Sequence, residues 1–244
     1  MRKPRRLTPE QLAPYQWQMP RTRTRESGLR TQTADDVDAA GAAPAEPIDW
    51  AILFGNPNPV EVEVGMGKGL FLLTAAAARP DTNFFGIEIV RKYQLYATTR
   101  FAIRNLPNVK TVCADAGWVF RRFVTAGSVA AVHVYFPDPW WKARHKKRRV
   151  FTPGFAADAA RVVREGGRLL IATDVEEYFG VMTGIVRAMP AFREVATETS
   201  RASVEEAGYQ TNFERKARQK GTPVWRATYE RTAGPVTEAA DPAG

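Results

Sequence analysis

The stretch VEVEVGMGKG, residues 60–69, gives the strongest indication of the fold class of this chain. Its alternating valines are typical of a β-strand, and the helix pattern GLFLLTAAAAR starts at its last glycine. Gly65, Gly67 and Gly69 stand between the two, where a tight turn needs residues that tolerate positive φ and close approach. In a doubly wound sheet, the turn after the first strand lies at the ligand crevice. The stretch therefore predicts a strand, a ligand-facing turn and a helix.

Strand and helix patterns alternate after this unit. Strands are expected at residues 83–90, 108–115, 128–136 and 168–174, and helices at residues 91–105, 116–127, 152–167 and 175–189. Thr152 and Pro153 supply the N-cap and first residue of the third of these helices. Closing strands are expected at residues 192–199 and 224–231. This alternation predicts a doubly wound α/β fold with a largely parallel sheet.

Composition sets the broad class of the protein. The chain has 244 residues, 44% of them hydrophobic, which is enough for a well-packed core. Trp118, Phe120 and Phe123 are expected in that core. The net charge of +9 indicates a polyanionic partner, nucleic acid before an anionic membrane, although a basic surface that binds nothing is the alternative. A single cysteine, Cys113, excludes an intrachain disulfide. Without a visible signal peptide or membrane span, we expect a soluble, cytoplasmic protein with no membrane partner.

The two ends of the chain differ from its centre. Residues 1–46 begin with a basic segment and continue into TADDVDAAGAAPAEP, which is rich in alanine, proline and acids. We expect these residues to form a basic, mostly disordered arm and linker. Residues 47–231 are expected to form the folded domain, and residues 232–244 a flexible tail.

The glycine turn favours an adenosine ligand without a pyrophosphate. The dinucleotide pattern GxGxxG needs glycine where Leu70 stands. Glu63, Glu88 and Asp115 fall at the ends of the first three expected strands. Glu88 can accept hydrogen bonds from ribose hydroxyls, and Asp115 lies where an adenine edge would be. Because carboxylates bind phosphate poorly, the set suits a cationic cofactor such as S-adenosylmethionine. The alternatives are a purely structural turn and acids that cap helices.

A second informative stretch is FPDPWWKARHKKRRV, residues 136–150. It follows the fourth strand, which we expect beside the first strand, across the switch point of the sheet. Its two prolines hold Asp138 and restrict both Phe136 and Asp138 to extended backbone. The basic and aromatic residues that follow suit an RNA phosphate backbone and an unstacked base. The alternatives are a stiff strand exit and a solvated charge run.

The blocks GMGKG, FFGIE, FPDPWWKARHKKRRV, LLIATDVEEY and TNFERKARQKGTPVWRATYER occur in this order. Over residues 50–231 they resemble the bacterial tRNA (guanine-N7-)-methyltransferase family. The resemblance implies the class I methyltransferase (Rossmann-like) fold with a seven-stranded, mostly parallel sheet. It also implies S-adenosylmethionine as cofactor and methylation of guanosine N7 in the variable loop of tRNA. Asn212, where the family often has lysine, and Trp141 depart from the family pattern.

The resemblance also implies which residues form the site. Cofactor contacts are implied for Glu63, Glu88, Asp115 and Asp138, beside Gly65 and Gly67 of the turn. Substrate contacts are implied for Lys142, Asp174, Thr211, Asn212, Phe213 and Glu214.

Guanine N7 carries a lone pair and no proton at pH 7, so its methylation requires no general base. In-line placement of N7 and the methyl group is worth up to about 7–11 kcal/mol. Nearby carboxylates stabilise the positive charge that the purine gains. Asp138 is the expected catalytic residue, and Asp174 and Glu214 are further candidates for contacting guanine. Asp174 can alternatively be the N-cap of the helix that follows it.

Other functions stay open on the sequence alone. They are methylation of another RNA or of an exocyclic base amine, and RNA binding without catalysis. A nicotinamide oxidoreductase is disfavoured by Leu70. His133, His145 and Cys113 lack the neighbours of a metal site, so no metal is expected. The sequence does not distinguish a monomer from a homodimer.

Overall fold

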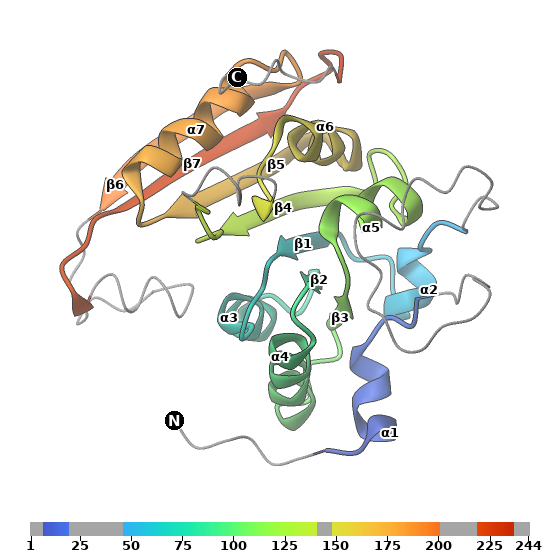
Figure 1. Cartoon of the computed structure of the whole chain (residues 1–244). Coiled ribbons are helices and arrows are strands. Elements are labelled where there is room, and N and C mark those ends of the chain that lie inside the picture. Colours follow the sequence, from blue (N-terminus) through green and yellow to red (C-terminus); the bar gives the residue numbers. More distant parts are fainter. Residues whose placement is uncertain (1–6, 20–45, 141–147, 201–218, 237–244) are drawn as a thin grey trace, which may run out of the picture.

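The computed structural model describes residues 7–19, 46–140, 148–200 and 219–236. These residues form a seven-stranded sheet in which the strands lie in the order β3-β2-β1-β4-β5-β7-β6 (Figure 1). Its strands are Val60–Val64 (β1), Asn83–Glu88 (β2), Val109–Cys113 (β3), Val129–Tyr135 (β4), Val163–Thr173 (β5), Phe192–Ser200 (β6) and Val224–Arg231 (β7). The helices of these residues are Pro9–Leu12 (α1), the 3-10 turn Ala13–Tyr15 (η1), Trp50–Phe54 (α2), Leu70–Ala78 (α3), Arg91–Ile103 (α4), Ala116–Phe123 (α5), Pro153–Val162 (α6) and Glu176–Arg187 (α7).

The topology is that of a doubly wound sheet. β1 pairs in parallel with both β2 and β4, and β3 and β5 extend the parallel part on either side. β7 is antiparallel to its neighbours β5 and β6. The strand order reverses between β1 and β4, so the switch point lies there. The expected doubly wound, mostly parallel sheet is confirmed.

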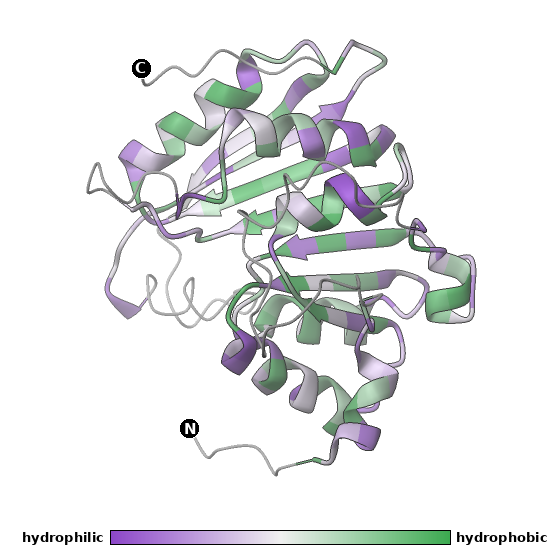
Figure 2. Cartoon of the chain, turned by 45° about the vertical axis from the view of Figure 1, so that its right-hand side comes forward, coloured by the Kyte–Doolittle hydropathy of each residue, from purple (hydrophilic) through white to green (hydrophobic). Residues whose placement is uncertain are grey.

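Helices cover both faces of the sheet (Figure 1). Consecutive side chains of β2 point to opposite faces. Phe84 packs with Phe71 of α3 and Phe101 of α4, whereas Phe85 joins a core shared with α5, α6 and α7. Hydrophobic residues accordingly run through both the strands and the helices that lie against them (Figure 2). The expected core residues Trp118, Phe120 and Phe123 are buried on the same face as Phe85.

A buried polar chain lies on the α3 side of β1 and β4. His133 Nε2 lies 2.9 Å from Glu61 Oε2, and His133 Nδ1 lies 2.9 Å from the Tyr135 hydroxyl. Arg79 donates to Glu61 Oε1 at 2.7 Å. Burial lowers the pKa of His133, so the neutral ring donates to Glu61 at pH 7. Burial raises the pKa of Glu61, but hydrogen bonds from His133 and Arg79 outweigh it and bring that pKa to about 2.

Glu61→Gln is expected to lower the free energy of unfolding by about 3 kcal/mol at pH 7. Because the pKa of Glu61 is lowered from 4.5 to about 2, its contribution is present above 4.5 and is lost as the pH falls toward 2. Urea denaturation at pH 7 and at pH 3 measures both effects, and the difference between the two proteins should shrink to about 1.4 kcal/mol at the lower pH. Equal stability at pH 7 would contradict the structural role of this carboxylate.

Residues 7–19 belong to the folded body, which differs from the prediction of a mostly disordered arm. The Trp17 N–H donates to the Thr111 carbonyl of β3 at 2.9 Å. Its ring centre lies 5.0 Å from that of Phe123 and 6.0 Å from that of Phe85. Leu12 is also buried. These apolar side chains anchor a segment whose overall composition had indicated disorder.

Two predicted helix ends are wrong. The helix expected at residues 116–127 ends at Phe123, and Val124 is already extended. The helix capped by Thr152 ends at Val162, and residues 163–167, expected at its end, begin β5 instead. Val163 pairs with Val129 of β4, and a Cβ on Gly167 would approach the carbonyl oxygen of residue 130 to 2.7 Å. Pairing with β4 therefore overrides the local helix pattern.

Within the described residues, no helix has the length and apolar character needed to span a bilayer.

Candidate active site

The carboxyl ends of the parallel strands carry a row of acids. Glu63 lies in β1 and Glu88 ends β2, while Asp115, Asp138 and Asp174 follow β3, β4 and β5 within three residues. Because these five strands are parallel, their carboxyl ends share one edge of the sheet (Figure 1). Ligands of doubly wound sheets bind at this edge, next to the switch point. The fold therefore brings these predicted site residues to one edge.

The glycine turn connects this edge to the helices. Gly65, Gly67 and Gly69 have φ of 71°, 53° and 65°. A Cβ on Gly69 would lie 2.6 Å from Phe101 Cζ, so this glycine is required for packing against α4. A Cβ on Gly65 or Gly67 would meet nothing closer than the turn's own backbone at 4.0 Å. The open space beside Gly65 and Gly67 fits their expected place next to a cofactor.

Glu63 is a buried acid with an unsatisfied oxygen. Its side chain is 3% exposed, and its Oε2 has no hydrogen-bond partner among the described residues. Burial, and then the nearby charge of Glu88, raises the pKa of Glu63 well above its ordinary value of 4.5. A buried carboxylate is costly unless a cation or a donor accompanies it. Glu63 therefore fits a cationic ligand such as S-adenosylmethionine.

Glu88 is fixed by the backbone around it. Its Oε2 accepts from the Gly67 N–H and its Oε1 from the Val90 N–H, both at 2.8 Å. Burial raises the pKa of Glu88; these N–H groups oppose the shift, and the charge of Asp138 adds to it. Each carboxylate oxygen keeps a second acceptor position. Glu88 can therefore accept from ribose hydroxyls while it holds the glycine turn.

Asp115 and Asp174 differ in their structural roles. Asp115 is the N-cap of α5 and accepts from the Trp118 N–H at 2.8 Å, so the capping alternative is confirmed. Its contact with adenine stays a prediction. The N-cap of α7 is Val175, whose N–H donates to Thr173 Oγ1 at 3.2 Å. The capping alternative for Asp174 is therefore wrong, and its partly buried carboxylate stays a candidate for guanine contact.

The loop that carries Asp138 leaves β4 through an uncommon backbone conformation. Phe136 has φ of 51° and Trp140 has φ of 42°, so the prediction of extended backbone is wrong for Phe136. The Phe136 N–H donates to the Ala172 carbonyl at 2.7 Å, and its ring is buried against Ala172 and Val224. Left-handed backbone at such a residue costs about 1–3 kcal/mol and persists where surrounding contacts hold it. Asp138 is exposed between these two residues.

Arg149 also holds this loop, a role that the sequence analysis missed. Its Nε donates to the Pro139 carbonyl at 2.7 Å, and its guanidinium carbon lies 5.1 Å from the centre of the Tyr178 ring. Burial raises the pKa of Tyr178 to about 12; Arg149 opposes this shift and Asp138 adds to it. Arg149 and Asp138 thus both lie near Tyr178. The apolar pair Val150 and Phe151, which follows the basic run, is the sequence signal that could have indicated an anchor here; Phe151 is buried.

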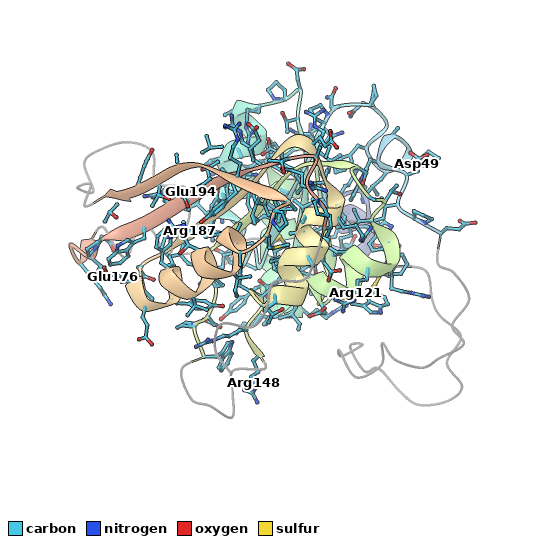
Figure 3. All side chains as sticks on the ribbon, turned by 90° about the horizontal axis from the view of Figure 1, so that it is seen from above. Asp49, Arg121, Arg148, Glu176, Arg187 and Glu194 are labelled. Carbon is cyan, nitrogen blue, oxygen red and sulfur yellow. The ribbon has the colours of Figure 1, made fainter. Side chains whose placement is uncertain are left out.

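Several predicted residues lie outside the described residues, and their roles stay predictions. They are Trp141, Lys142, His145, Thr211, Asn212, Phe213 and Glu214. The guanidinium carbon of Arg148 lies 5.2 Å from the centre of the Trp140 ring, and Arg148 projects away from the body of the fold (Figure 3). In the part of the chain that the structure describes, no group of three His, Cys, Asp or Glu side chains could hold a metal ion.

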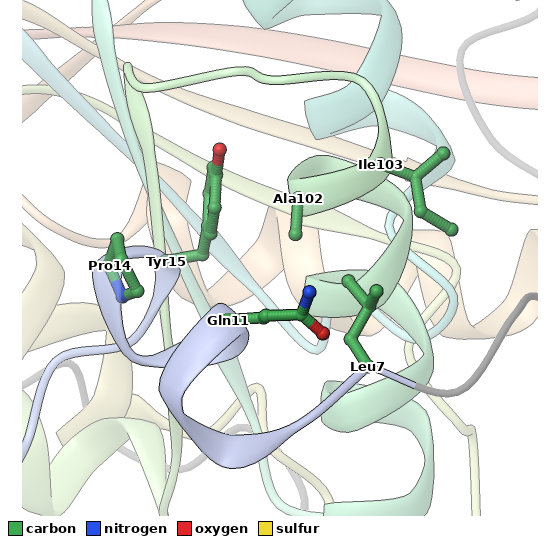
Figure 4. A pocket seen from close by; sticks show the side chains of 6 residues that line it. All are labelled: Leu7, Gln11, Pro14, Tyr15, Ala102 and Ile103. Carbon is green, nitrogen blue, oxygen red and sulfur yellow. The ribbon is translucent and has the colours of Figure 1, made fainter.

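A pocket between α1, η1 and the end of α4 is separate from this edge (Figure 4). Its lining residues are Leu7, Gln11, Pro14, Tyr15, Ala102 and Ile103. These side chains carry no charge. Since α4 runs from the carboxyl end of β2 to the amino end of β3, its last residues lie far from the acids. The pocket is therefore not the cofactor site.

Comparisons with known proteins point to methyltransferases. A family model described as "Putative methyltransferase" matches residues 57–227. The tRNA (guanine-N(7)-)-methyltransferase of Rhodopirellula baltica is 40% identical over 185 residues, which cover 73% of this chain and 68% of that protein. The enzyme of the same name from Aliivibrio salmonicida is 34% identical over 186 residues, which cover 76% of this chain and 78% of that protein.

A solved structure shares the fold at much lower sequence identity. It is the 16S rRNA (adenine(1408)-N(1))-methyltransferase of Catenulisporales acidiphilia with its cosubstrate SAM. The TM-score is 0.53 at 15% identity, and the alignment covers 76% of this chain and 91% of that one. This similarity supports the Rossmann-like α/β fold of the methyltransferases.

Proposed function

Because this chain belongs to the tRNA (guanine-N(7)-)-methyltransferase family, we propose that it methylates N7 of a guanosine in the variable loop of tRNA. S-adenosylmethionine is the cofactor. The proposed substrate is tRNA, and the proposed location of the protein is the cytoplasm. The observation that carries the proposal is the unpaired, buried carboxylate of Glu63 beside Glu88 and Asp138 at the carboxyl edge of the sheet.

The chain's own residues divide the binding of the cofactor among them. Glu63 supplies a buried negative charge for a cationic group, and Glu88 supplies acceptors for ribose hydroxyls. Gly65 and Gly67 leave room beside the turn. Asp115 is proposed to accept from the adenine amine with the lone pairs that its capping bond leaves free. When bound, the cofactor supplies an electrophilic methyl group on a positively charged sulfur.

Asp138 is proposed to act on the guanine. The reacting N7 has no proton to lose, so Asp138 need not be a general base. It instead accepts from the base and stabilises the positive charge that the purine ring gains. The proline-flanked loop and the Arg149 contact to the Pro139 carbonyl hold it in place for this task. Asp174 at the end of β5 is proposed as a second guanine contact.

Contacts to the rest of the tRNA are proposed for residues within the blocks FPDPWWKARHKKRRV and TNFERKARQKGTPVWRATYER. They are Lys142, Thr211, Asn212, Phe213 and Glu214, which match the substrate positions of the family. Their mix of a cation, an aromatic ring and hydrogen-bonding groups suits a phosphate and an unstacked base.

Transfer of a labelled methyl group to unmodified bulk tRNA, followed by nucleoside analysis, tests the proposed reaction. The expected product is 7-methylguanosine as the only labelled nucleoside. Label on an exocyclic amine would show that the acceptor is this amine and not N7, although the protein would still be a methyltransferase. Cofactor binding without any labelled tRNA nucleoside would remove tRNA as the substrate.

A further inference from the structure

The exposed side of α4 carries cations at a spacing of four residues. Lys92, Tyr96, Arg100 and Arg104 follow one another at this spacing, which keeps them on the same side of a helix. Lys68 of the glycine turn lies beside them, because its Nζ is 5.9 Å from the centre of the Tyr96 ring. We call these five residues the α4 stripe. Lys68, Lys92 and Arg104 are exposed, and the other two are partly buried.

No carboxylate neutralises the stripe within the described residues. None of the ion pairs found there includes one of its cations. Residues 65–113 contain seven Lys and Arg but only two acids, Asp81 and Glu88. Glu88 is buried at the cofactor edge, and Asp81 lies in the turn before β2, at the opposite edge. Cations left uncompensated on one face favour a polyanionic partner.

The stripe is organised without a ligand. The Arg100 Nη1 donates to the Lys68 carbonyl at 2.7 Å. The guanidinium carbon of Arg100 lies 5.9 Å from the centre of the Tyr96 ring, the same distance as the Lys68 ammonium. Burial lowers the pKa of Arg100; Tyr96 opposes this shift, and the neighbouring charge of Arg104 adds to it. Lys68, Tyr96 and Arg100 are thus held together before binding, which reduces the entropy lost when a partner contacts them.

The stripe begins at the cofactor edge and leads away from it. Lys68 follows Gly67, whose N–H is bonded to Glu88. From there α4 extends for 13 residues, about 20 Å, toward the amino end of β3. Arg148, an exposed cation beside the ring of Trp140, follows the loop after β4, on the other side of β1. A tRNA whose guanine reaches the switch point would therefore meet cations on either side of it.

We propose that the α4 stripe is a second tRNA-binding surface, which contacts the phosphate backbone away from the methylated guanosine. The inference rests on the proposed function, since it assumes that tRNA is the partner. Cations beside an aromatic ring match RNA better than a lipid surface, since both backbone and base can be contacted. Lys92 and Arg104 each neutralise a phosphate, and Arg100 keeps the stripe joined to the glycine turn.

The test compares two double variants that remove the same charge. Lys92→Gln/Arg104→Gln changes the stripe, and Arg164→Gln/Arg168→Gln changes two exposed arginines near the start of β5. Equilibrium binding of tRNA is measured over a range of salt concentrations. The stripe variant is expected to lower the slope of log K against log salt by about 1.4–1.8 and to weaken binding by about 25- to 60-fold at 0.1 M salt. The control variant should keep the wild-type slope.

Activity separates this inference from the proposed function. With the stripe variant, the KM for tRNA should rise while kcat and the KM for S-adenosylmethionine stay at wild-type values. A wild-type salt slope in the stripe variant, or an equal loss in both variants, would overturn the inference even if wild type methylates tRNA. Loss of binding to anionic vesicles with an unchanged tRNA slope would reassign the stripe to membranes. If wild type binds tRNA but methylates no nucleoside, the proposed function fails while the binding result still decides the stripe.

Discussion

Replacement of Asp138 by asparagine is expected to lower kcat for methyl transfer to tRNA by about 10²–10³-fold, the usual cost of one lost electrostatic contact in a transition state. The carboxylate is exposed three residues beyond β4, and its charge adds to the raised pKa of both Glu88 and Tyr178. Asparagine keeps the shape of the side chain but removes the charge that faces the methylated purine. Single-turnover transfer at saturating tRNA and cofactor measures this step directly.

Asp81→Asn is the matched control for this experiment. Asp81 is an exposed carboxylate in the turn before β2, at the edge of the sheet opposite the site. Its replacement removes the same charge and should leave kcat unchanged. If Asp138→Asn retains at least half of the wild-type rate, Asp138 does not stabilise the transition state. Positioning by the other site residues would then account for catalysis.

Glu63→Gln is expected to weaken S-adenosylmethionine binding by about 10- to 100-fold, because a charge-assisted contact is worth about 1.5–3 kcal/mol. The Glu63 carboxylate is buried and its Oε2 lacks a partner among the described residues, so a bound cation is its natural counterpart. Glutamine has nearly the same volume but carries no charge. Isothermal titration with the cofactor measures the loss, and unchanged affinity would show that Glu63 does not face the cationic group.

The same variant is expected to alter how stability depends on pH. The pKa of Glu63 is raised above 4.5 in the folded protein, mainly by burial, so the folded state holds the proton more tightly than the unfolded state. Its contribution is therefore fully present below 4.5 and is lost as the pH rises through the folded pKa. Without cofactor, wild type should lose up to about 1.4 kcal/mol per pH unit relative to Glu63→Gln in that range.

Glu61 provides the internal comparison, since it lies two residues earlier on the same face of β1. Its pKa is lowered, so Glu61→Gln should be most destabilising near neutral pH and harmless in acid. The two variants should thus show opposite pH trends in urea denaturation. Parallel trends would mean that burial, and not the partners of each carboxylate, decides their charge.

The fold could be predicted because its signals are local. The valines of residues 60–64, the three glycines after them and the alternation that follows specify strand, turn and helix without reference to distant residues. The place of β4 beside β1 followed from the same topology. Helix ends were less predictable: Val163 continues a helical pattern in sequence, yet its pairing with Val129 places it in β5.

The positions of the site acids could be predicted, but their surroundings could not. Glu63 was expected at the edge, whereas the missing partner of its Oε2 depends on how β2 and the glycine turn pack around it. The positive φ of Phe136 depends on a hydrogen bond to Ala172, 36 residues away along the chain. Likewise, the contact of Arg149 with Pro139 exists only once the loop has folded back, and charge composition alone suggested an RNA contact.

A tRNA that contains 7-deazaguanosine in place of the methylated guanosine tests whether N7 is the acceptor atom. This nucleoside has a carbon-bound hydrogen where guanosine has N7, while its Watson–Crick edge is unchanged. We expect such a tRNA to bind with a Kd within about twofold of normal tRNA, since the phosphate contacts that dominate affinity are retained. It should accept no methyl group from S-adenosylmethionine. Methylation of this tRNA at the normal rate would rule out N7 as the acceptor, because the methyl group would then go to another atom.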